Sequence, residues 1–549
     1  MEGKRGERPV IVPEPASLSF DGRWLKFDGL SYGTERIFRE FGIRKGRWKL
    51  RKEERGGQGV SVEEGVIRYW GKKEIAFATI IQLILQGHGY LPEVSVEERM
   101  DFEFRCFHLD IARGGVPTVD TAMGMIRWLF LLKYTHFSIY FEDLFPWRNY
   151  REIGNGRGRM KEGEFRRIFN YGRLMGIDVF PSLELLGHME HILTLEKYSG
   201  LSELWWRGDD CLDLTNPEAK KLALGLLEDA LSLSESKYVL VGGDETWSLG
   251  RGRSLDRLGQ YRGPELYIEH YKSIIELVKR HGKEPILWGD MLTGMYLNPE
   301  GRMRWAEVVK SDLWNDVFIA HWDYTDGDKD HFSGKIDSIG HKDRQFACPG
   351  LSNWLTFYPD FDVALKNMEN FFSAAKSSGL RGFIITAWGD GGSECLFSFL
   401  QPLLVAGSCL SEGGDWKEAW MALSGESKEI LEARILLGEH SLSKRVRKII
   451  QNPPGMLPHE NGELAEWKRV RGKIARIELP EDLNFARLSL NLAIKVAEGR
   501  ASENDFKEFS SKFEKLWLSE RKAENLDRVV GNIWSSAGKC GLQNKLRRE

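Results

Sequence analysis

The chain has 549 residues, a formal charge of −3 and 29% charged residues, a length that suits roughly two to four folded domains. This near-neutral balance argues against a nucleic-acid-binding protein and against an acidic solvating tail. Six scattered cysteines without a C-x-x-C pair argue against a zinc site or a disulfide framework, and they favour a reducing compartment.

Residues 1–98 predict a small α/β domain. β-rich runs separated by glycine and charged turns indicate strands at 24–27, 59–62 and 66–70. A helical pattern follows at 73–86 and ends at Gly87. Residues 91–98 are interpreted as a polar connector to the next domain.

Targeting and membrane signals are not visible in the sequence. Residues 1–8 are mostly charged or glycine, without the apolar segment of a secretion signal. The longest apolar stretch, 75–85, is too short to span a bilayer. We therefore expect a cytoplasmic protein without a membrane partner.

Between residues 99 and 410 strand and helix patterns alternate, which is typical of parallel βαβ units. Candidate strands lie at 104–111, 136–142, 177–184, 238–243, 284–289, 316–323, 345–351 and 382–388. The sixth connection, 326–340, is polar and its helical pattern is weak. The alternation predicts a (β/α)₈ TIM barrel as the catalytic domain. Charged amphipathic patterns from 411 to 549 predict a helical C-terminal region, and a homodimer contact is left open.

Glycine-rich segments do not predict a nucleotide cofactor. No G-x-G-x-x-G fingerprint or P-loop opens a helix after any candidate strand. The segment from Gly154 to Gly158 is rich in glycine, but no apolar strand precedes it. We interpret it as a mobile loop, and we expect no cofactor.

The candidate strand at 238–243 leads into Gly242-Gly243-Asp244-Glu245. The two glycines allow a sharp turn or a close approach to a ligand. Residues just past the carboxyl ends of barrel strands face the active-site mouth. An isolated Asp-Glu pair is more often a helix cap, so its interpretation depends on what the other strand ends carry.

The other strand ends carry acids, a few basic side chains and aromatic rings. They are Arg105 and Asp110, Glu142 and Asp143, Glu184 and His188, Trp288 and Asp290, Trp322, Asp323 and Tyr324, Trp354, and Trp388 and Asp390. Any one tryptophan is better explained by core packing, but four at eight strand ends are not. Acids that bind hydroxyls, beside aromatic faces that cover C–H faces, predict a site for a neutral polyhydroxylated ring.

Four of these segments resemble family 20 glycoside hydrolases, the β-N-acetylhexosaminidases. They are 105–113, 241–245, 287–290 and 386–392. Gly187-His188 is similar to a Pro-Gly-His turn of that family, and Val12-Pro13-Glu14-Pro15 to the start of its N-terminal domain. The resemblance spans about residues 10–410. It implies an exo-acting enzyme that releases terminal β-linked GlcNAc or GalNAc, with the substrate's own 2-acetamido oxygen as nucleophile.

The resemblance also implies a role for each site residue. Glu245 would be the general acid and later the base, and Asp244 would orient the acetamide N–H. Repulsion between two neighbouring carboxylates makes one of them hold its proton more tightly, which supports this division. The expected sugar-binding residues are Arg105 at the C3 and C4 hydroxyls, Trp288, Trp388 and Trp354 around the acetamide, Trp322, Tyr324 or Asp323 near it, Asp390 at the far hydroxyls, and Glu142, Asp143 and His188 as a relay to Glu245.

Two alternatives remain open. One is a conventional two-carboxylate barrel glycosidase, in which Glu245 acts with Glu184 or Asp290. The other is a non-catalytic carbohydrate-binding protein on the same fold, against which the intact Asp244-Glu245 pair argues. In each case the partner is a small-molecule glycan. A metal is not expected, because no histidine-rich cluster has the spacing of a zinc site.

Overall fold

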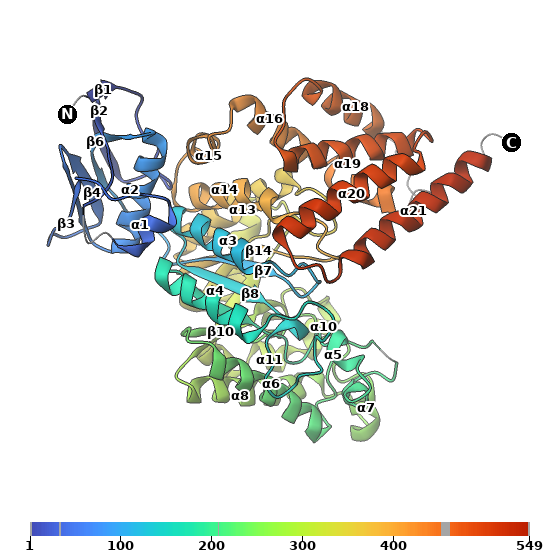
Figure 1. Ribbon diagram of the computed structural model, residues 1–549. Coiled ribbons are helices and arrows are strands. Elements are labelled where there is room, and N and C mark those ends of the chain that lie inside the picture. Colours follow the sequence, from blue (N-terminus) through green and yellow to red (C-terminus); the bar gives the residue numbers. More distant parts are fainter. Residues whose placement is uncertain (1–2, 32–34, 207, 452–461, 547–549) are drawn as a thin grey trace.

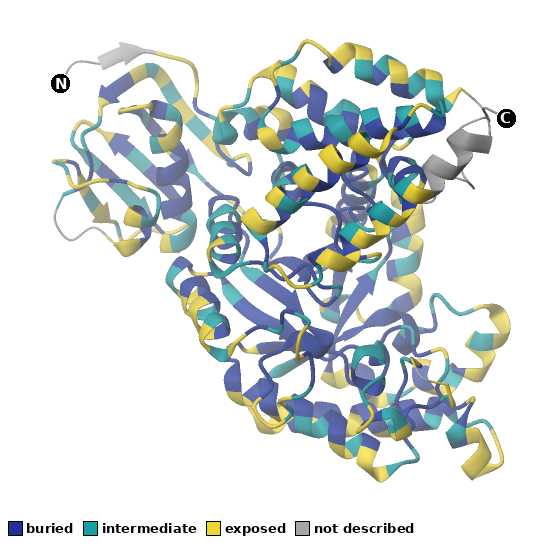
Figure 2. Ribbon diagram, turned by 45° about the vertical axis from the view of Figure 1, so that its right-hand side comes forward, coloured by how far each residue is buried: buried dark blue, intermediate teal, exposed yellow. Residues whose placement is uncertain are grey.

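The structure is a computed structural model that describes residues 3–31, 35–206, 208–451 and 462–546. It has an N-terminal sheet, a closed barrel and a C-terminal set of helices. In Figure 1 the sheet (blue) lies on one side of the barrel, and the C-terminal helices (red) pack against the barrel. Figure 2 shows that the barrel strands are almost wholly buried.

The N-terminal sheet has the strand order β1-β2-β6-β4-β5-β3. Its strands are β1 (Gly3–Arg5), β2 (Ser17–Lys26), β3 (Lys49–Lys52), β4 (Gly59–Glu63), β5 (Val66–Trp70) and β6 (Tyr90–Glu97), with helices α1 (Arg36–Glu40) and α2 (Lys73–Gly87). The predicted connector at 91–98 is wrong, because β6 pairs with both β2 and β4. Leu91, Val94 and Val96 of β6 are buried. Pro92 and the polar residues between them interrupt the apolar–polar alternation that would have predicted a strand.

The eight-stranded barrel is confirmed. Parallel strands close it in the order β10-β11-β12-β13-β14-β7-β8-β9. Their bounds are β7 (Phe104–Asp110), β8 (His136–Tyr140), β9 (Asp178–Ser182), β10 (Tyr238–Leu240), β11 (Glu284–Trp288), β12 (Phe318–Trp322), β13 (Gln345–Cys348) and β14 (Gly382–Ala387). Side chains such as Phe104, Phe180, Tyr238 and Phe346 fill its interior, as expected for a packed barrel core.

Helices surround the barrel at the expected connections. The main ones are α3 (Val119–Leu131), α4 (Glu162–Met175), α6 (Pro217–Leu233), α8 (Gly263–Arg280), α12 (Lys329–Ile339), α13 (Phe361–Ser378) and α14 (Gln401–Glu412), and shorter helical turns are α5 (Glu190–Leu193), α7 (Arg253–Leu258), α9 (Gly289–Thr293), α10 (Pro299–Arg304) and α11 (Ala306–Val309). The weak pattern at 326–340 is nevertheless a helix, α12. Asp328 caps it by accepting from the His331 N–H, and Phe332, Ile336 and Ile339 are buried. A narrow apolar stripe is enough to stabilise a helix in an otherwise polar segment when that stripe packs against the barrel.

The predicted helical C-terminal region is also present. It consists of α15 (Trp416–Ser424), α16 (Lys428–Leu437), α17 (Ser443–Gln451), α18 (Glu463–Ile474), α19 (Glu481–Ala497), α20 (Glu503–Glu520) and α21 (Leu526–Leu546). Arg447 and Gln451 donate to Oε1 of Glu394 at 2.7 and 3.0 Å. Arg521 donates to the carbonyls of Ser393, at 2.8 Å, and Cys395. The helices thus hold the loop that follows β14.

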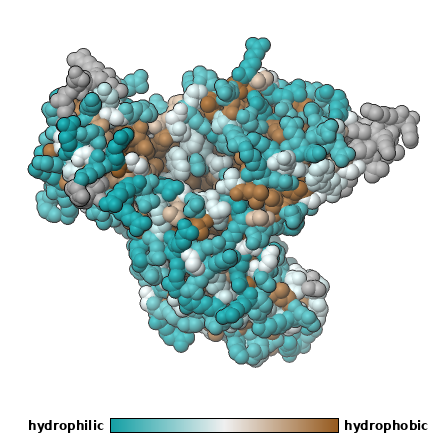
Figure 3. Space-filling view, viewed as in Figure 1, coloured by the Kyte–Doolittle hydropathy of each residue, from teal (hydrophilic) through white to brown (hydrophobic). Residues whose placement is uncertain are grey.

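The surface is mostly hydrophilic on the face that Figure 3 shows, with hydrophobic residues in small separate groups. Within the described ranges, every helix is too short or too polar to cross a membrane.

Candidate active site

The loop after β10 turns sharply at two glycines. Gly242 and Gly243 have φ angles of 71° and 97°, in the region that glycine enters without strain. A Cβ on Gly242 would lie 2.2 Å from Oε2 of Glu184, so a larger residue does not fit. Glu245 also has a positive φ, of 50°, which non-glycine residues adopt mainly where the surroundings impose it. The turn places Asp244 and Glu245 at the carboxyl ends of the barrel strands.

One imidazole lies against both carboxylates. Nε2 of His188 is 3.4 Å from Oδ2 of Asp244 and 3.5 Å from Oε2 of Glu245. The Asp244 side chain is almost enclosed, whereas 43% of the Glu245 side chain is exposed. The backbone N–H of Glu245 donates to Oδ2 of Asp290 at 2.8 Å. The two consecutive acids therefore have different surroundings, and Glu245 is the more exposed of the two.

Burial and like charge favour the protonated form of several acids in this cluster. Burial and the Asp244 carboxylate raise the pKa of Glu245, while His188 opposes the shift. The same two causes raise the pKa of Asp290 to about 8 and that of Glu184 well above its usual value. Burial alone would lower the pKa of His188, but Asp244 and Glu184 raise it well above its usual value. Burial and like charge in this site thus favour the protonated form of the carboxyl groups, and the neighbouring acids favour the protonated form of His188.

Aromatic rings from neighbouring strand ends form one cluster at this end of the barrel. The centroids of Trp288 and Trp388 are 5.7 Å apart, and Nε1 of Trp388 donates to the Tyr324 hydroxyl at 2.8 Å. The Tyr324 ring in turn lies 5.4 Å from Trp322 and 5.1 Å from Trp354. Trp288 is fully buried, and the other rings are partly exposed. The predicted tryptophans and Tyr324 therefore lie together.

Arg113, which was not predicted as a site residue, lies at the same end of the barrel. Its NH1 group is 2.9 Å from Oε1 of Glu142 and 3.3 Å from Oδ2 of Asp110, and its Nε is 3.6 Å from Oδ1 of Asp390. Its guanidinium carbon is 5.8 Å from the centroid of Trp388. Its position in the sequence could have indicated a site residue, because Arg113 follows the end of β7 within the 105–113 segment.

Arg105 lies at the opposite end of the barrel, contrary to the prediction that it binds the sugar. It is the second residue of β7, and its Nε donates to the Lys133 carbonyl at 2.8 Å while NH1 donates to the Phe102 carbonyl. The amino ends of parallel strands face away from the mouth. Arg105 therefore supports the barrel base and does not reach Asp244.

Asp323 also faces away from the site, contrary to the prediction that it binds the sugar. Its Oδ1 accepts from Thr325, and its Oδ2 accepts from Lys335 and lies 2.9 Å from His331 Nε2. Successive residues of an extended segment point to opposite sides. Tyr324, the next residue, accordingly points toward Trp388, and Asp323 points toward α12.

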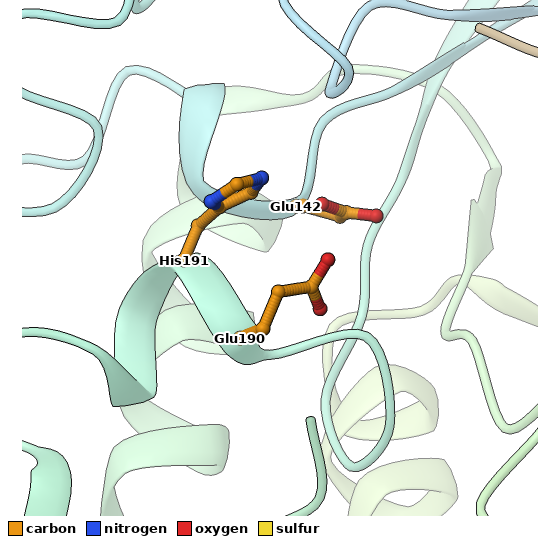
Figure 4. Close-up of side chains that lie close together, drawn as sticks. All are labelled: Glu142, Glu190 and His191. Atoms are coloured by element: carbon orange, nitrogen blue, oxygen red, sulfur yellow. The ribbon is translucent and has the colours of Figure 1, made fainter. Parts of the chain in front are cut away.

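Glu142 and Asp143 are both buried behind the mouth. Glu142 accepts from the Tyr140 hydroxyl at 3.0 Å and pairs with Arg113, while burial raises its pKa to about 8. Asp143 pairs with Nε of Arg157 at 2.8 Å. Ligand atoms of Glu142, Glu190 and His191 lie within 4.8 Å of one another (Figure 4). Because Glu142 already pairs with Arg113, we interpret Glu142 as a residue that orients Arg113 and not as a metal ligand.

The glycine-rich segment 154–158, predicted as a mobile loop, is held in place. Arg157 donates to Asp143, and its NH2 donates to the Ala112 carbonyl at 2.7 Å. A Cβ on Gly154 would lie 2.3 Å from the Asp143 carbonyl oxygen. The loop therefore packs directly against the end of β8 and buttresses the site.

The sequence was compared with protein-family models and with known proteins, and both comparisons find similar glycosidases. Residues 102–329 match the model described as glycosyl hydrolase family 20, catalytic domain. The chain is 27% identical over 370 residues to hexosaminidase D of Homo sapiens, covering 62% of this chain and 71% of that protein. It is 24% identical over 218 residues to hexosaminidase D of Bos taurus, covering 38% and 62%.

Structural comparisons show that the chain shares its fold with solved barrel enzymes. A GH20 exo-β-N-acetylglucosaminidase from Vibrio harveyi, solved in complex with N-acetylglucosamine, has a TM-score of 0.58 at 14% identity over 77% of this chain and 78% of that one. A β-N-acetylhexosaminidase from Bacteroides fragilis has a TM-score of 0.58 at 18% identity, over 76% and 96%. At such low identity these likenesses establish the fold, and the match of residues 102–329 locates the catalytic domain within it. Residues 102–329, which form most of the barrel, are therefore similar to the catalytic domain of glycosyl hydrolase family 20.

Proposed function

We propose that this protein is an exo-acting β-N-acetylhexosaminidase that releases terminal β-linked GlcNAc or GalNAc with retention of configuration. The observation that carries the proposal is the pair Asp244 and Glu245, one enclosed and one exposed, beside a tryptophan cluster. In the proposed reaction, the 2-acetamido oxygen of the substrate attacks its own anomeric carbon, as in substrate-assisted glycosidases. Residues 99–410 supply the proposed catalytic groups.

Glu245 is the proposed acid and base. Its carboxyl proton passes to the glycosidic oxygen as the bond to the anomeric carbon breaks, and the acetamide oxygen bonds to that carbon. The resulting carboxylate then takes a proton from the water that opens the oxazolinium ring. A raised pKa suits this role, and burial with the Asp244 charge raises the pKa of Glu245.

Asp244 is the proposed partner of the acetamide. Its carboxylate would accept a hydrogen bond from the acetamide N–H, which turns the carbonyl oxygen toward the anomeric carbon. The same negative charge would offset the positive charge of the oxazolinium ring. Enclosure strengthens this electrostatic effect, because little water screens it.

Arg113 and Asp390 are the proposed ligands of the remaining hydroxyls. Glu142 and Asp110 hold the guanidinium of Arg113, and the Asp390 side chain is 43% exposed. A guanidinium donates in a fixed planar fork and a carboxylate only accepts, so together they can satisfy vicinal hydroxyls. Arg113 thus takes the role first expected of Arg105.

Replacing Arg113 with lysine is expected to lower kcat/KM for an aryl β-GlcNAc by about 10²-fold, because an ammonium group cannot reproduce the planar fork. Arg105→Lys is the matched control at the other end of the barrel, where the site residues are out of reach. It should lower the melting temperature and change kcat/KM by less than about twofold, since only support of the barrel base is altered. Equal losses in both variants would contradict the assignment of Arg113.

A conventional two-carboxylate mechanism is less well supported. It needs a second acid that reaches the anomeric carbon. Both carboxyl oxygens of Glu184 are buried, and Gly242 packs directly against them. Asp290 is fully buried and accepts from the backbone of Glu245. The non-catalytic alternative is also disfavoured, since a mere binding site does not need Asp244, Glu245 and His188 in contact.

A thiazoline analogue of the oxazolinium ion tests the proposed mechanism. We expect it to inhibit hydrolysis of aryl β-GlcNAc competitively, with an inhibition constant at least about 10²-fold below KM, because it resembles the intermediate. The matching aryl β-glucoside, which has a hydroxyl in place of the acetamide, should not be hydrolysed. Turnover of that glucoside without thiazoline inhibition would favour the conventional mechanism, and thiazoline binding without any turnover would favour the non-catalytic protein.

A further inference from the structure

A pocket of about 520 Å³ lies between the N-terminal sheet and the amino end of the barrel. Its lining comes from both parts of the chain, with Gln58 and the first turn of α2 on one side and Arg105, Lys133 and Ile177 on the other. A volume of this size is typical of small-molecule sites, which occur preferentially at domain interfaces. The proposed sugar site lies at the opposite end of the barrel, so this pocket is separate from it.

Arg105 is a buried arginine whose positive charge is incompletely paired. It is 5% exposed, and its Nε and NH1 groups donate to the carbonyls of Lys133 and Phe102. In the part of the chain that the structure describes, its NH2 group has no hydrogen-bond partner and its guanidinium forms no ion pair. Buried charges in proteins are normally paired. Because the side chain lines the pocket, an anion bound there would supply both missing interactions.

The acids nearest to Arg105 are already engaged by other groups. Glu98 pairs with Lys133, and its Oε1 accepts from the Thr79 hydroxyl at 2.6 Å. The Glu412 carboxylate accepts from two backbone N–H groups. Burial lowers the pKa of Arg105 by more than Glu412 and Glu98 raise it. The protein itself therefore compensates this buried positive charge only in part.

The start of α2 is a second feature that favours an anion. Lys72, Glu74 and Ile75 line the pocket, and the N-cap residue, Lys72, makes no side-chain cap. The N–H groups and the dipole of this 15-residue helix favour negative charge at its amino end. The acids of the lining oppose this only weakly, because Lys72 offsets Glu74 and Arg381 pairs with Glu103 at 3.0 Å.

Apolar side chains form much of the remaining lining, namely Phe102, Phe130, Met175 and Ile177. They suit the hydrocarbon part of a ligand, whereas an inorganic anion would occupy only a fraction of the volume. We propose that the pocket binds a small organic carboxylate, with its carboxylate on Arg105 and its apolar part against these four side chains. The remaining N–H donors of the guanidinium suit a carboxylate, because the planar fork matches its two oxygens.

The test uses the full-length protein and two probes of the same shape, 3-phenylpropionate and its neutral amide. Isothermal titration calorimetry should show saturable binding of the carboxylate, at least about tenfold tighter than that of the amide, because only the charged group pairs with Arg105. Inorganic phosphate should bind more weakly than 3-phenylpropionate, since it leaves the apolar lining uncovered. Binding should persist when the thiazoline saturates the sugar site.

Two variants alter the pocket from opposite sides. Arg105→Gln should weaken 3-phenylpropionate binding at least about tenfold, because it removes the charge. Ile75→Trp should do the same with Arg105 intact, because the larger ring fills the pocket from α2. Arg521→Gln is the matched control, since Arg521 is also a buried arginine that donates to two carbonyls but does not line this pocket. Its affinity for the probe should equal that of the wild type.

The assignment would be overturned by an absence of saturable binding or by equal affinities for the acid and the amide. It would also be overturned if both pocket variants bound 3-phenylpropionate as the wild type does, or if phosphate bound more tightly than 3-phenylpropionate. Loss of binding in the presence of the thiazoline would place the probe in the sugar site instead.

Discussion

Replacing Glu245 with glutamine is expected to lower kcat/KM for a β-linked GlcNAc disaccharide by about 10³-fold, because general acid catalysis is typically worth 10²–10⁴-fold. The amide keeps the size of the side chain but has no proton to give to the glycosidic oxygen. A dinitrophenyl β-GlcNAc, whose leaving group needs little protonation, should lose less activity in bond cleavage. Steady-state kinetics on both substrates measure the difference, and similar rates for wild type and variant would remove Glu245 from the mechanism.

The pH profile provides a second measure of the same group. Glu245 must be protonated for bond cleavage, so activity on the disaccharide falls as pH rises through its pKa. Burial and the Asp244 charge raise this pKa, so the protonated form persists toward neutral pH. The residual activity of Glu245→Gln should lack this alkaline limb. An identical limb in both proteins would assign it to another residue.

Replacing Asp244 with asparagine is expected to lower kcat for aryl β-GlcNAc by about 10²–10³-fold, as does the loss of one preorganised electrostatic contact in other enzymes. The amide retains a carbonyl oxygen for the acetamide N–H, but it has no charge to offset the oxazolinium ion. KM should change much less than kcat, because the charge develops after binding. Affinity for the thiazoline should fall by a factor similar to that in kcat.

Asp323→Asn is the control for the Asp244 substitution. Asp323 is also a buried acid at a strand end, but it pairs with Lys335 and lies beside His331. Its loss should lower the melting temperature and leave kcat within about twofold, since only packing against α12 is altered. If thiazoline affinity were unchanged in Asp244→Asn, the acetamide partner would have to be another residue.

The barrel could be predicted because each strand combines an apolar run with a polar end. The structure places the eight strands within the predicted ranges, and the turn at Gly242 and Gly243 lies where the glycines indicated it. The positions of the acids after the predicted strands located them in the barrel, because the carboxyl ends of parallel strands share one mouth. Sequence reasoning was therefore strongest where one local pattern determines both the element and its direction.

Errors arose where a side chain's orientation decided its role. Arg105 lies near the amino end of β7 and Arg113 follows its carboxyl end, so the two arginines lie at opposite ends of the barrel. Asp323 and Tyr324 are neighbours, and their alternation depends on the register of β12 against β13. The hydrogen bond from the Glu245 N–H to Asp290 joins loops from two strands, and the distance between two such loops is not visible in the order of the residues.

The attachment of the C-terminal helices has a consequence for how this catalytic domain can be isolated. Arg447, Gln451 and Arg521 supply the donors for Glu394 and for the carbonyls of Ser393 and Cys395. A fragment that stopped at the end of the barrel would lose these donors and would expose the loop after β14 to solvent. The segment that carries Trp388 and Asp390 would then lose its scaffold, so we expect that a stable catalytic fragment must extend at least through Arg521, the residue that follows α20.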